Sequence, residues 1–236
     1  MVRKCISGSG SARICRVGIF TVIAILSASI CGNRALAASA GPLDGYTGAP
    51  SEASGTEPNC TSCHSEFVIN SGPGLLSIDA PETYQPGITY EITVLVTHIG
   101  RRQWGFELTA IDEALFGAGE LVPGLDGFTQ VSMTGSRDYA KQTSLGTADG
   151  QLDQQAWTFS WIAPQTDIGP VTFHAAGVAG NSTGGSSGDD VYTAAIGVPE
   201  PSFLSLQLVG WIYLIGLKSL STQRSIGSAE RASGIV

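Results

Sequence analysis

The sequence carries one compact group of residues that could do chemistry, Cys60-Thr61-Ser62-Cys63-His64. It matches C-x-x-C-H, the attachment motif of c-type haem. Two thiols at this spacing can reach the two vinyl groups of one porphyrin, and the imidazole of the next residue can then ligate the iron. The motif therefore predicts covalent haem c, with thioether bonds from Cys60 and Cys63 and with His64 as the proximal iron ligand.

The same residues allow three other uses. Cys60 and Cys63 could form a local disulfide. They could also act as a redox dithiol, although no βαβ pattern typical of thioredoxin-like proteins surrounds them. A structural zinc ion would need a fourth ligand besides both thiols and His64, and His98 or His174 would have to supply it.

The second axial ligand of the iron has few candidates. The chain contains three histidines and two methionines, one of which is the initial Met1. His98, His174 and Met133 are therefore the candidates, unless this position has no protein ligand. His98 ends an apolar strand pattern, His174 lies on the polar face of another strand, and Met133 lies in a weaker pattern. Each could equally be an ordinary packing or surface residue.

The N-terminal segment reads as a secretory signal peptide over residues 1–37. It holds five basic and no acidic side chains, then an apolar run, then a small-x-small pattern that ends at Ala37. Cleavage near Ala37 or Ala40 would leave Cys60 and Cys63 as the only cysteines, in a compartment that permits oxidised thiols. An uncleaved membrane anchor is the alternative.

The C-terminal segment, residues 198–236, contains Pro199-Glu200-Pro201, an apolar run over 203–217 and later basic residues. A 15-residue helix is about 22 Å long, shorter than a hydrocarbon core of about 30 Å. This arrangement resembles the PEP-CTERM sorting signal. The resemblance implies recognition by an exosortase-like enzyme and display at the outer surface of a Gram-negative-type bacterium. A plain membrane anchor is the alternative.

The segment between the two ends is strongly acidic. Residues 38–198 hold four basic and 18 acidic side chains. Nucleic-acid binding requires a dense basic patch, so this charge excludes it, whereas it suits docking to a basic redox partner. The sequence shows no nucleophile elbow, phosphate loop or His-Glu-x-x-His motif. Asp189 and Asp190 are neighbours on an expected strand and would point to opposite faces. We therefore expect no enzyme.

Short alternating runs predict the fold. Apolar residues recur at every second position, with Gly and Pro between the runs, which is typical of strands in an antiparallel sandwich. We predict an all-β, immunoglobulin-like sandwich over residues 73–197, preceded by an irregular Gly/Ser-rich arm over 38–72 that carries the C-x-x-C-H motif. Helical targeting segments are expected at both ends. The expected strands lie near 75–79, 88–97, 104–110, 128–134, 138–145, 157–161, 171–175 and 192–196.

Several strings, together with the C-x-x-C-H motif, resemble bacterial proteins of the choice-of-anchor V family, which are related to the Reelin (Reeler) domain. The resemblance covers residues 43–197 and implies a Reelin-like β-sandwich, a C-x-x-C-H arm before it and surface display through varied anchors. It implies no established activity. The matching strings begin at Gly45 (GYTGAP), Tyr84 (YQPGITY), Trp104 (WGFELTA), Trp157 (WTFSWIAP), Gly169 (GPVTF) and Asp190 (DVYT).

One departure from that family concerns the iron. Its members often carry a His-Thr pair shortly before the Trp-x-Phe-x-Trp strand, whereas this chain has Lys141-Gln142-Thr143. If that histidine is a distal ligand in the family, this chain lacks it, and the iron would be five-coordinate or ligated by one of the three candidates above.

These observations predict an exported, surface-anchored c-type haem protein that transfers electrons or senses a redox state or a ligand at the cell envelope. Its partners would be a redox protein, a sorting enzyme and, before processing, the membrane. The alternative is a haem-free adhesion or extracellular-matrix module in which a Cys60–Cys63 disulfide pins the arm.

Overall fold

The computed structural model describes residues 39–200. The predicted signal peptide over 1–37, the C-terminal segment from Pro201 onward and the helices expected in both lie outside these residues. Within the described part of the chain, no helix is long and apolar enough to cross a membrane.

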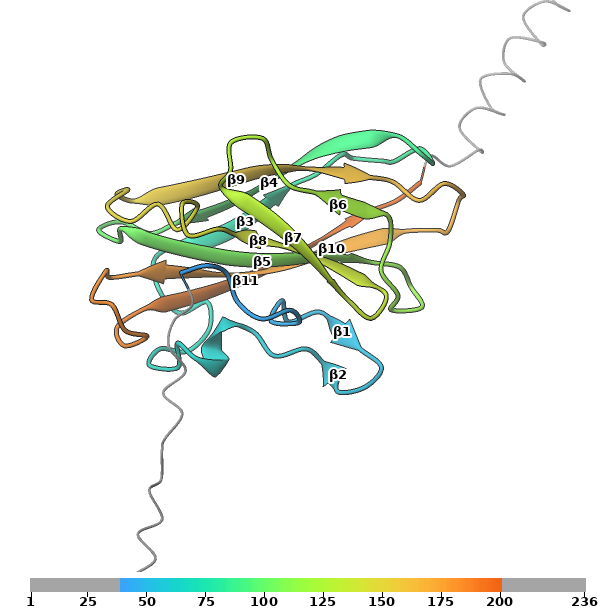
Figure 1. Cartoon of the computed structure of the whole chain (residues 1–236). Helices are drawn as coiled ribbons and strands as arrows, with labels where there is room; N and C mark the ends of the chain where they lie inside the picture. The colour runs from blue at the N-terminus through green and yellow to red at the C-terminus, as the bar shows by residue number, and fades with distance from the viewer. Residues whose placement is uncertain (1–38, 201–236) are drawn as a thin grey trace, which may run out of the picture. The chain divides into compact units, whose positions relative to one another are not determined.

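Two antiparallel sheets stack face to face and form a sandwich (Figure 1). Every strand pairing in them is antiparallel. The five-stranded sheet has the order β11 (Asp190–Val198), β10 (Val171–Gly180), β5 (Gln103–Ile111), β8 (Arg137–Gln142) and β7 (Thr129–Thr134). The four-stranded sheet has the order β3 (Leu75–Asp79), β4 (Thr89–Thr97), β9 (Gln154–Ile162) and β6 (Glu120–Val122).

The core between the sheets is aromatic. In β9, Trp157, Phe159 and Trp161 alternate with less buried residues, so all three rings point inward. Phe106 of the facing sheet stacks on Trp157 with ring centroids 4.5 Å apart, and Phe173 meets Trp161 edge to face at 5.0 Å. Such pairs add about 0.5–1.5 kcal/mol each beyond the area they bury. The core therefore fixes how the two sheets face each other.

The predicted all-β, immunoglobulin-like antiparallel sandwich is confirmed. Each predicted strand has a counterpart, from β3 to β11, within a few residues of the expected bounds. The sequence pattern missed β6, β1 (Pro50–Ser51) and β2 (Gly55–Thr56), because two or three residues are too few to show an alternation.

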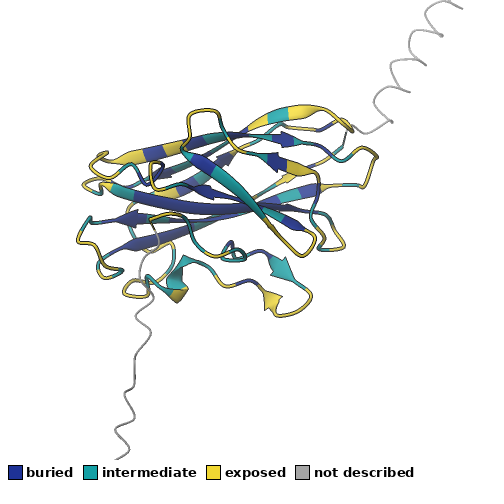
Figure 2. Cartoon of the chain, in the orientation of Figure 1, coloured by how far each residue is buried: buried dark blue, intermediate teal, exposed yellow. Residues whose placement is uncertain are grey.

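The arm predicted over residues 38–72 is described from residue 39 and runs to residue 74, because β3 begins at Leu75. It crosses the outer face of the five-stranded sheet (Figure 1). It is less irregular than predicted: β1 and β2 pair as a small hairpin, and the 3-10 turn η1 (Cys60–Ser62) follows. The arm covers the sheet so well that β5 is buried on both faces from Trp104 to Ile111 (Figure 2).

A buried ionic cluster holds the hairpin to the sheet. Arg137 Nη1 of β8 donates to Glu57 Oε1 of the arm at 2.6 Å, and the Tyr139 hydroxyl donates to the same oxygen at 2.7 Å. Glu57 Oε2 accepts from the Thr47 hydroxyl at 2.5 Å, and Arg137 Nη2 donates to the Pro50 carbonyl at 2.7 Å. These bonds join the arm to the five-stranded sheet.

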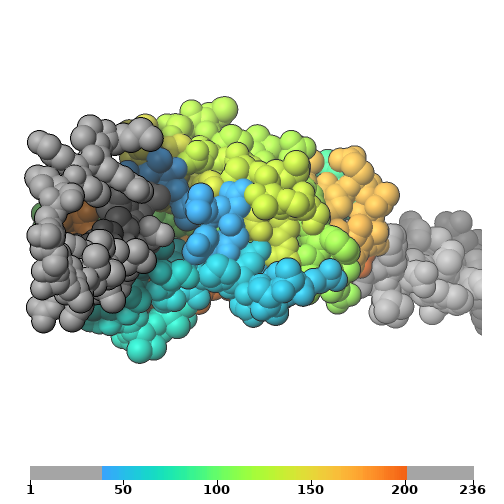
Figure 3. All heavy atoms as spheres, turned by 60° about the horizontal axis from the view of Figure 1, so that its bottom comes forward, coloured from blue at the N-terminus to red at the C-terminus, as the bar shows by residue number. Residues whose placement is uncertain are grey.

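A second ion pair holds the start of the arm. Asp44 accepts hydrogen bonds from Lys141 Nζ at 2.5 Å, from Ser132 Oγ at 2.5 Å and from Thr134 Oγ1 at 2.6 Å. In Figure 3 the blue and cyan atoms of the arm lie against the yellow-green atoms of β7 and β8. Both attachments use side chains of β7 and β8, so this half of the sheet carries the arm.

Glu57→Gln should weaken the attachment. It leaves the Arg137 guanidinium buried without a counter-charge, and breaking a buried ion pair in this way costs about 3–5 kcal/mol. We expect a lower urea midpoint and faster proteolysis within the arm. Glu52→Gln, in the exposed turn between β1 and β2, is the control and should stay within about 0.5 kcal/mol of the original protein. Equal stability of both variants would contradict the role given to Glu57.

Candidate functional site

The 3-10 turn η1 sets the geometry of the C-x-x-C-H motif. Asn59 caps the turn, because its Oδ1 accepts from the Thr61 N–H at 2.9 Å and from the Thr61 hydroxyl at 2.7 Å. The N–H groups of Cys63 and His64 then donate to the Cys60 carbonyl at 3.2 and 2.9 Å. This tight turn brings both thiols and the imidazole to one cavity.

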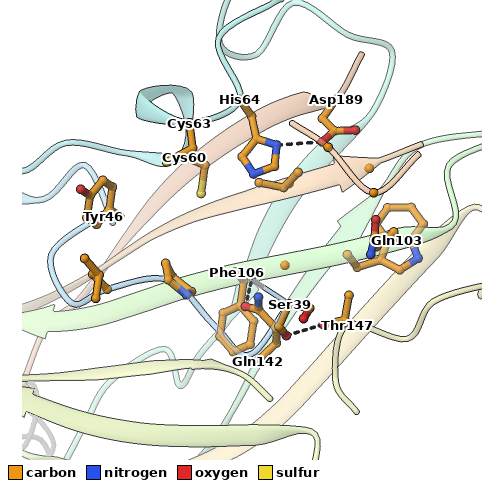
Figure 4. Close-up of a pocket in the computed structure, with 18 residues that line it drawn as sticks. Ser39, Tyr46, Cys60, Cys63, His64, Gln103, Phe106, Gln142, Thr147 and Asp189 are labelled. Atoms are coloured by element: carbon orange, nitrogen blue, oxygen red, sulfur yellow. Dashed lines mark hydrogen bonds and ion pairs between the residues drawn. The ribbon is translucent and has the colours of Figure 1, made fainter. Parts of the chain in front are cut away.

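The cavity has a volume of about 480 Å³ and lies between the arm and the outer face of the five-stranded sheet (Figure 4). That volume falls in the range of about 300–1,000 Å³ typical of cofactor and small-molecule pockets. The lining comprises Ser39, Pro42, Leu43, Tyr46, Cys60, Cys63 and His64 of the arm, Gln103, Trp104, Gly105 and Phe106 of β5, Gln142 and Thr147, and Val178, Gly180, Gly184, Gly185 and Asp189.

The cavity exists because β5 and β8 separate. They pair only at Glu107 with Lys141 and at Leu108 with Ala140. Beyond that point, the Phe106 N–H donates to the side-chain Oε1 of Gln142 at 2.9 Å instead of to a strand carbonyl. A glycine at position 105 also matters, because a Cβ there would lie 3.0 Å from Gln142 Nε2. The sheet thus opens next to the motif.

His64 is held in a defined orientation. Its Nδ1 donates to Asp189 Oδ2 at 2.8 Å, and Asp189 Oδ1 accepts from the Asn181 N–H at 3.0 Å (Figure 4). Asp189 is 3% exposed, so water does not replace this bond. Because a carboxylate can only accept, the bond places the proton on Nδ1 and leaves the Nε2 lone pair available to a metal.

The Cys60 thiol is in an unreactive state. Burial raises its pKa to about 12, with further contributions from the charges of Glu107 and Cys63. Both cysteines are free thiols in this structure. Redox-active C-x-x-C motifs have a lowered thiol pKa, so this environment does not favour the redox-dithiol alternative.

Glu107 is an unexpected carboxyl beneath the arm. It is completely buried; its Oε2 accepts from the Tyr46 N–H at 2.5 Å, and its Oε1 has no hydrogen-bond partner within residues 39–200. Lys141 Nζ lies 4.0 Å from that Oε1. Burial raises the pKa of Glu107 to about 8, although the Tyr46 N–H acts in the opposite direction. Its carboxyl is therefore largely protonated at neutral pH.

The three candidates for the second axial ligand do not join His64. None of His98, His174 and Met133 lines the cavity. His98 Nε2 lies 3.1 Å from Asp190 Oδ2, and its Nδ1 is bonded to the Ile99 carbonyl at 2.9 Å.

His174 lies on β10 opposite Thr109, where burial and then the charge of Arg137 lower the pKa of its imidazole. Met133 of β7 is 71% exposed. Within residues 39–200, no three His, Cys, Asp or Glu side chains are grouped as a metal site, so His98 and His174 do not complete the suggested zinc site.

Three site residues were not expected from the sequence. The sequence singles out Asp189 only as the neighbour of Asp190, and the two carboxylates do point apart, one to His64 and the other to His98 and Arg101. The sequence gives one indication of Glu107, because it is the single charged residue in the otherwise uncharged strand WGFELTA. Gln142 stands where the proteins that this sequence resembles often carry a histidine.

No protein-family model and no curated protein matches this chain. Several solved structures are weakly similar to it. A chain of the CaDoc0917(R16D)–CaCohA2 complex is 10% identical over 50% of this chain and 99% of its own length, with a TM-score of 0.30.

The N-terminal domain of the Streptococcus gordonii adhesin Sgo0707 is 9% identical over 54% of this chain and 32% of its own, with a TM-score of 0.33. The chitin-binding domain of Chi18aC from Streptomyces coelicolor is 12% identical over 39% of this chain and 83% of its own length, with a TM-score of 0.24. These similarities do not indicate what this chain binds.

Glu107→Gln should change how stability depends on pH. The pKa of Glu107 in the folded protein is about 8, above the usual 4.5. Between these two values the unfolded chain gives up a proton that the folded chain retains. The free energy of unfolding therefore falls as pH rises from about 4.5 to about 8. Glutamine cannot titrate. Urea unfolding should therefore show similar stabilities near pH 4, and a variant more stable by a few kcal/mol near pH 9. Glu91→Gln, at an exposed position of β4, is the control. A constant difference across pH would contradict the assignment.

Asp189→Ala should release the imidazole of His64. Without the carboxylate, no hydrogen bond from Nδ1 to Asp189 stabilises the Nδ1–H tautomer, so the Nε2–H tautomer should become populated. The ¹⁵N resonances of the His64 ring report this directly in the haem-free protein. His98 serves as the internal control, because its partner is Asp190. An unchanged His64 ring would show that Asp189 does not set the tautomer.

Proposed function

We propose that this protein is an exported, surface-anchored c-type haem protein that transfers electrons or senses a redox state or ligand at the cell envelope. Cys60 and Cys63 would hold the haem, and His64 would be its proximal ligand. One observation carries the proposal: all three residues of the motif open onto the same cavity of about 480 Å³.

The residues present fit the cofactor. The cavity is lined largely by apolar side chains and glycines, and its single carboxylate, Asp189, already engages His64. A thiol adds its S–H across a vinyl double bond, sulfur to one carbon and hydrogen to the other, so attachment needs no oxidant.

The protein's own residues would bind and orient the cofactor. When bound, haem supplies an iron that exchanges single electrons or takes up a small ligand. The hydrogen bond from His64 to Asp189 fixes the ring. In the haem-loaded protein it would make Nε2 a stronger electron-pair donor to the iron and so would favour the oxidised state. Tyr46 and Leu43 of the arm line the cavity and would contact the bound cofactor.

The sequence supports the cellular part of the proposal. The signal peptide implies export, and Pro199-Glu200-Pro201 implies sorting by an exosortase-like enzyme, with transient membrane association before processing. Pro199 follows β11 directly, and its carbonyl accepts from the Tyr84 N–H at 3.1 Å. The strongly acidic body suits a basic redox partner or an extracellular-matrix component.

Haem attachment can be tested directly. The full chain is expressed in a bacterial host that matures c-type haem, and its intact mass and pyridine haemochrome spectrum are measured. We expect a mass larger by one haem and an α-band. The double variant Cys60→Ser/Cys63→Ser should lose both signals, whereas Ser62→Ala, an exposed position in the same turn, should keep them.

A bare polypeptide mass without an α-band would overturn the haem proposal. If that mass is two hydrogens lighter than the reduced chain, the cysteines form a disulfide. The better hypothesis for this protein would then be a haem-free adhesion or extracellular-matrix module.

A further inference from the structure

Two carboxyl groups join the arm to the five-stranded sheet, and each has a cation as its partner. Glu57 pairs with Arg137, and Asp44 pairs with Lys141. A third carboxyl group, that of Glu107, comes from β5 beneath the arm. The nearest cation to it is the same Lys141, whose Nζ lies 4.0 Å from Glu107 Oε1 but 2.5 Å from Asp44. Glu107 therefore has no cation of its own among residues 39–200.

The Glu107 carboxyl is held in a neutral, protonated state by its surroundings. It is completely buried, its Oε2 accepts from the Tyr46 N–H at 2.5 Å, and its Oε1 has no hydrogen-bond partner within the described residues. A buried carboxylate with an unpaired oxygen is costly, so burial raises the pKa of Glu107 to about 8. A modest change in nearby charge is then enough to change its protonation near neutral pH.

Glu107 lies next to the cavity that the C-x-x-C-H motif enters. Tyr46, whose N–H it binds, and Phe106, which precedes it in β5, both line that cavity (Figure 4). The charge of Glu107 also acts on the Cys60 thiol, which would hold the haem. Charges interact strongly where burial excludes water. A change of charge at a haem held by Cys60 would therefore act on the Glu107 carboxyl.

We propose that Glu107 is a redox-linked proton site, which releases its proton when a haem in the cavity is oxidised and takes it up when the haem is reduced. On oxidation one electron passes from the iron to a one-electron acceptor protein, and one proton passes from the carboxyl to water. The carboxylate that remains balances the positive charge gained at the iron. The inference rests on the proposed function and narrows it to electron transfer coupled to proton exchange.

Other ionisable groups lie on the elements around Glu107, namely Asp44, Glu57, Cys60, Tyr139, Lys141 and, on the neighbouring strand β10, His174. Ion pairs keep the two carboxylates and the lysine charged. Burial keeps the thiol and the phenol neutral. Burial and then the charge of Arg137 lower the pKa of His174, so its imidazole is uncharged at neutral pH. Glu107 is therefore the group of this set that changes its charge near neutral pH.

The midpoint potential of the haem-loaded full chain tests the coupling, measured from about pH 5 to about pH 9, on both sides of the Glu107 pKa. An added positive charge favours the carboxylate, so we expect the acid dissociation constant of Glu107 to be about tenfold larger in the oxidised protein. A tenfold change corresponds to about 59 mV for one electron, and the potential should fall by this amount as pH rises.

Two variants identify the group responsible. Glu107→Gln has nearly the same shape and cannot titrate, so it should lose this fall in potential. Glu91→Gln, at an exposed position of β4, should keep it. The carboxylate side groups of haem also titrate, but their contribution remains in both variants. If Glu107→Gln keeps the pH dependence of the original protein, the assignment to Glu107 is wrong.

A second measurement uses the unchanged protein and does not depend on how a variant folds. The infrared difference spectrum between the reduced and oxidised forms should show the carbonyl band of a protonated carboxyl group in the reduced form only. Glu107→Gln should lack this band, and Glu91→Gln should keep it. A difference spectrum of the original protein without the band would overturn the inference and leave the haem proposal standing, whereas absence of haem would overturn both.

Discussion

Arg137 carries a positive charge where water scarcely reaches, and the arm depends on that charge. A buried guanidinium without a counter-ion would destabilise the sheet, so Glu57, brought over by the hairpin, compensates it while Tyr139 and Thr47 share the carboxylate. The outer face of the five-stranded sheet is therefore not a solvated surface. It is a polar surface whose hydrogen bonds are completed by residues about 80 positions earlier in the chain.

The cavity follows from the same arrangement. The arm is held at β7 and β8, and the C-x-x-C-H turn lies farther along it, where β5 has separated from β8. A continuous sheet would give the motif a flat surface and no volume. Instead Gln142 and Thr147 take over the hydrogen bonds of β5, and glycines at 105 and 180 leave space. The site is thus a gap in pairing with an arm laid across it.

The sequence predicted the parts that depend on local pattern. Alternation located the long strands, and the C-x-x-C-H spacing located the motif. The partners of the motif could not be predicted in this way. Asp189 lies 125 positions from His64, and Gln142 meets Phe106 only because two strands diverge. Such contacts depend on register and on where pairing stops, which no short window of sequence contains.

The place of the arm before the sandwich has a consequence for the order of events. If the chain is exported as proposed, its N-terminal part emerges first, and the C-x-x-C-H turn reaches the far side of the membrane before any long strand has. Asp189 and the glycine loop, which complete the cavity, arrive more than 100 residues later. The thiols would be accessible to a maturation enzyme on an extended chain. The sandwich would then fold onto a turn that already carries its cofactor.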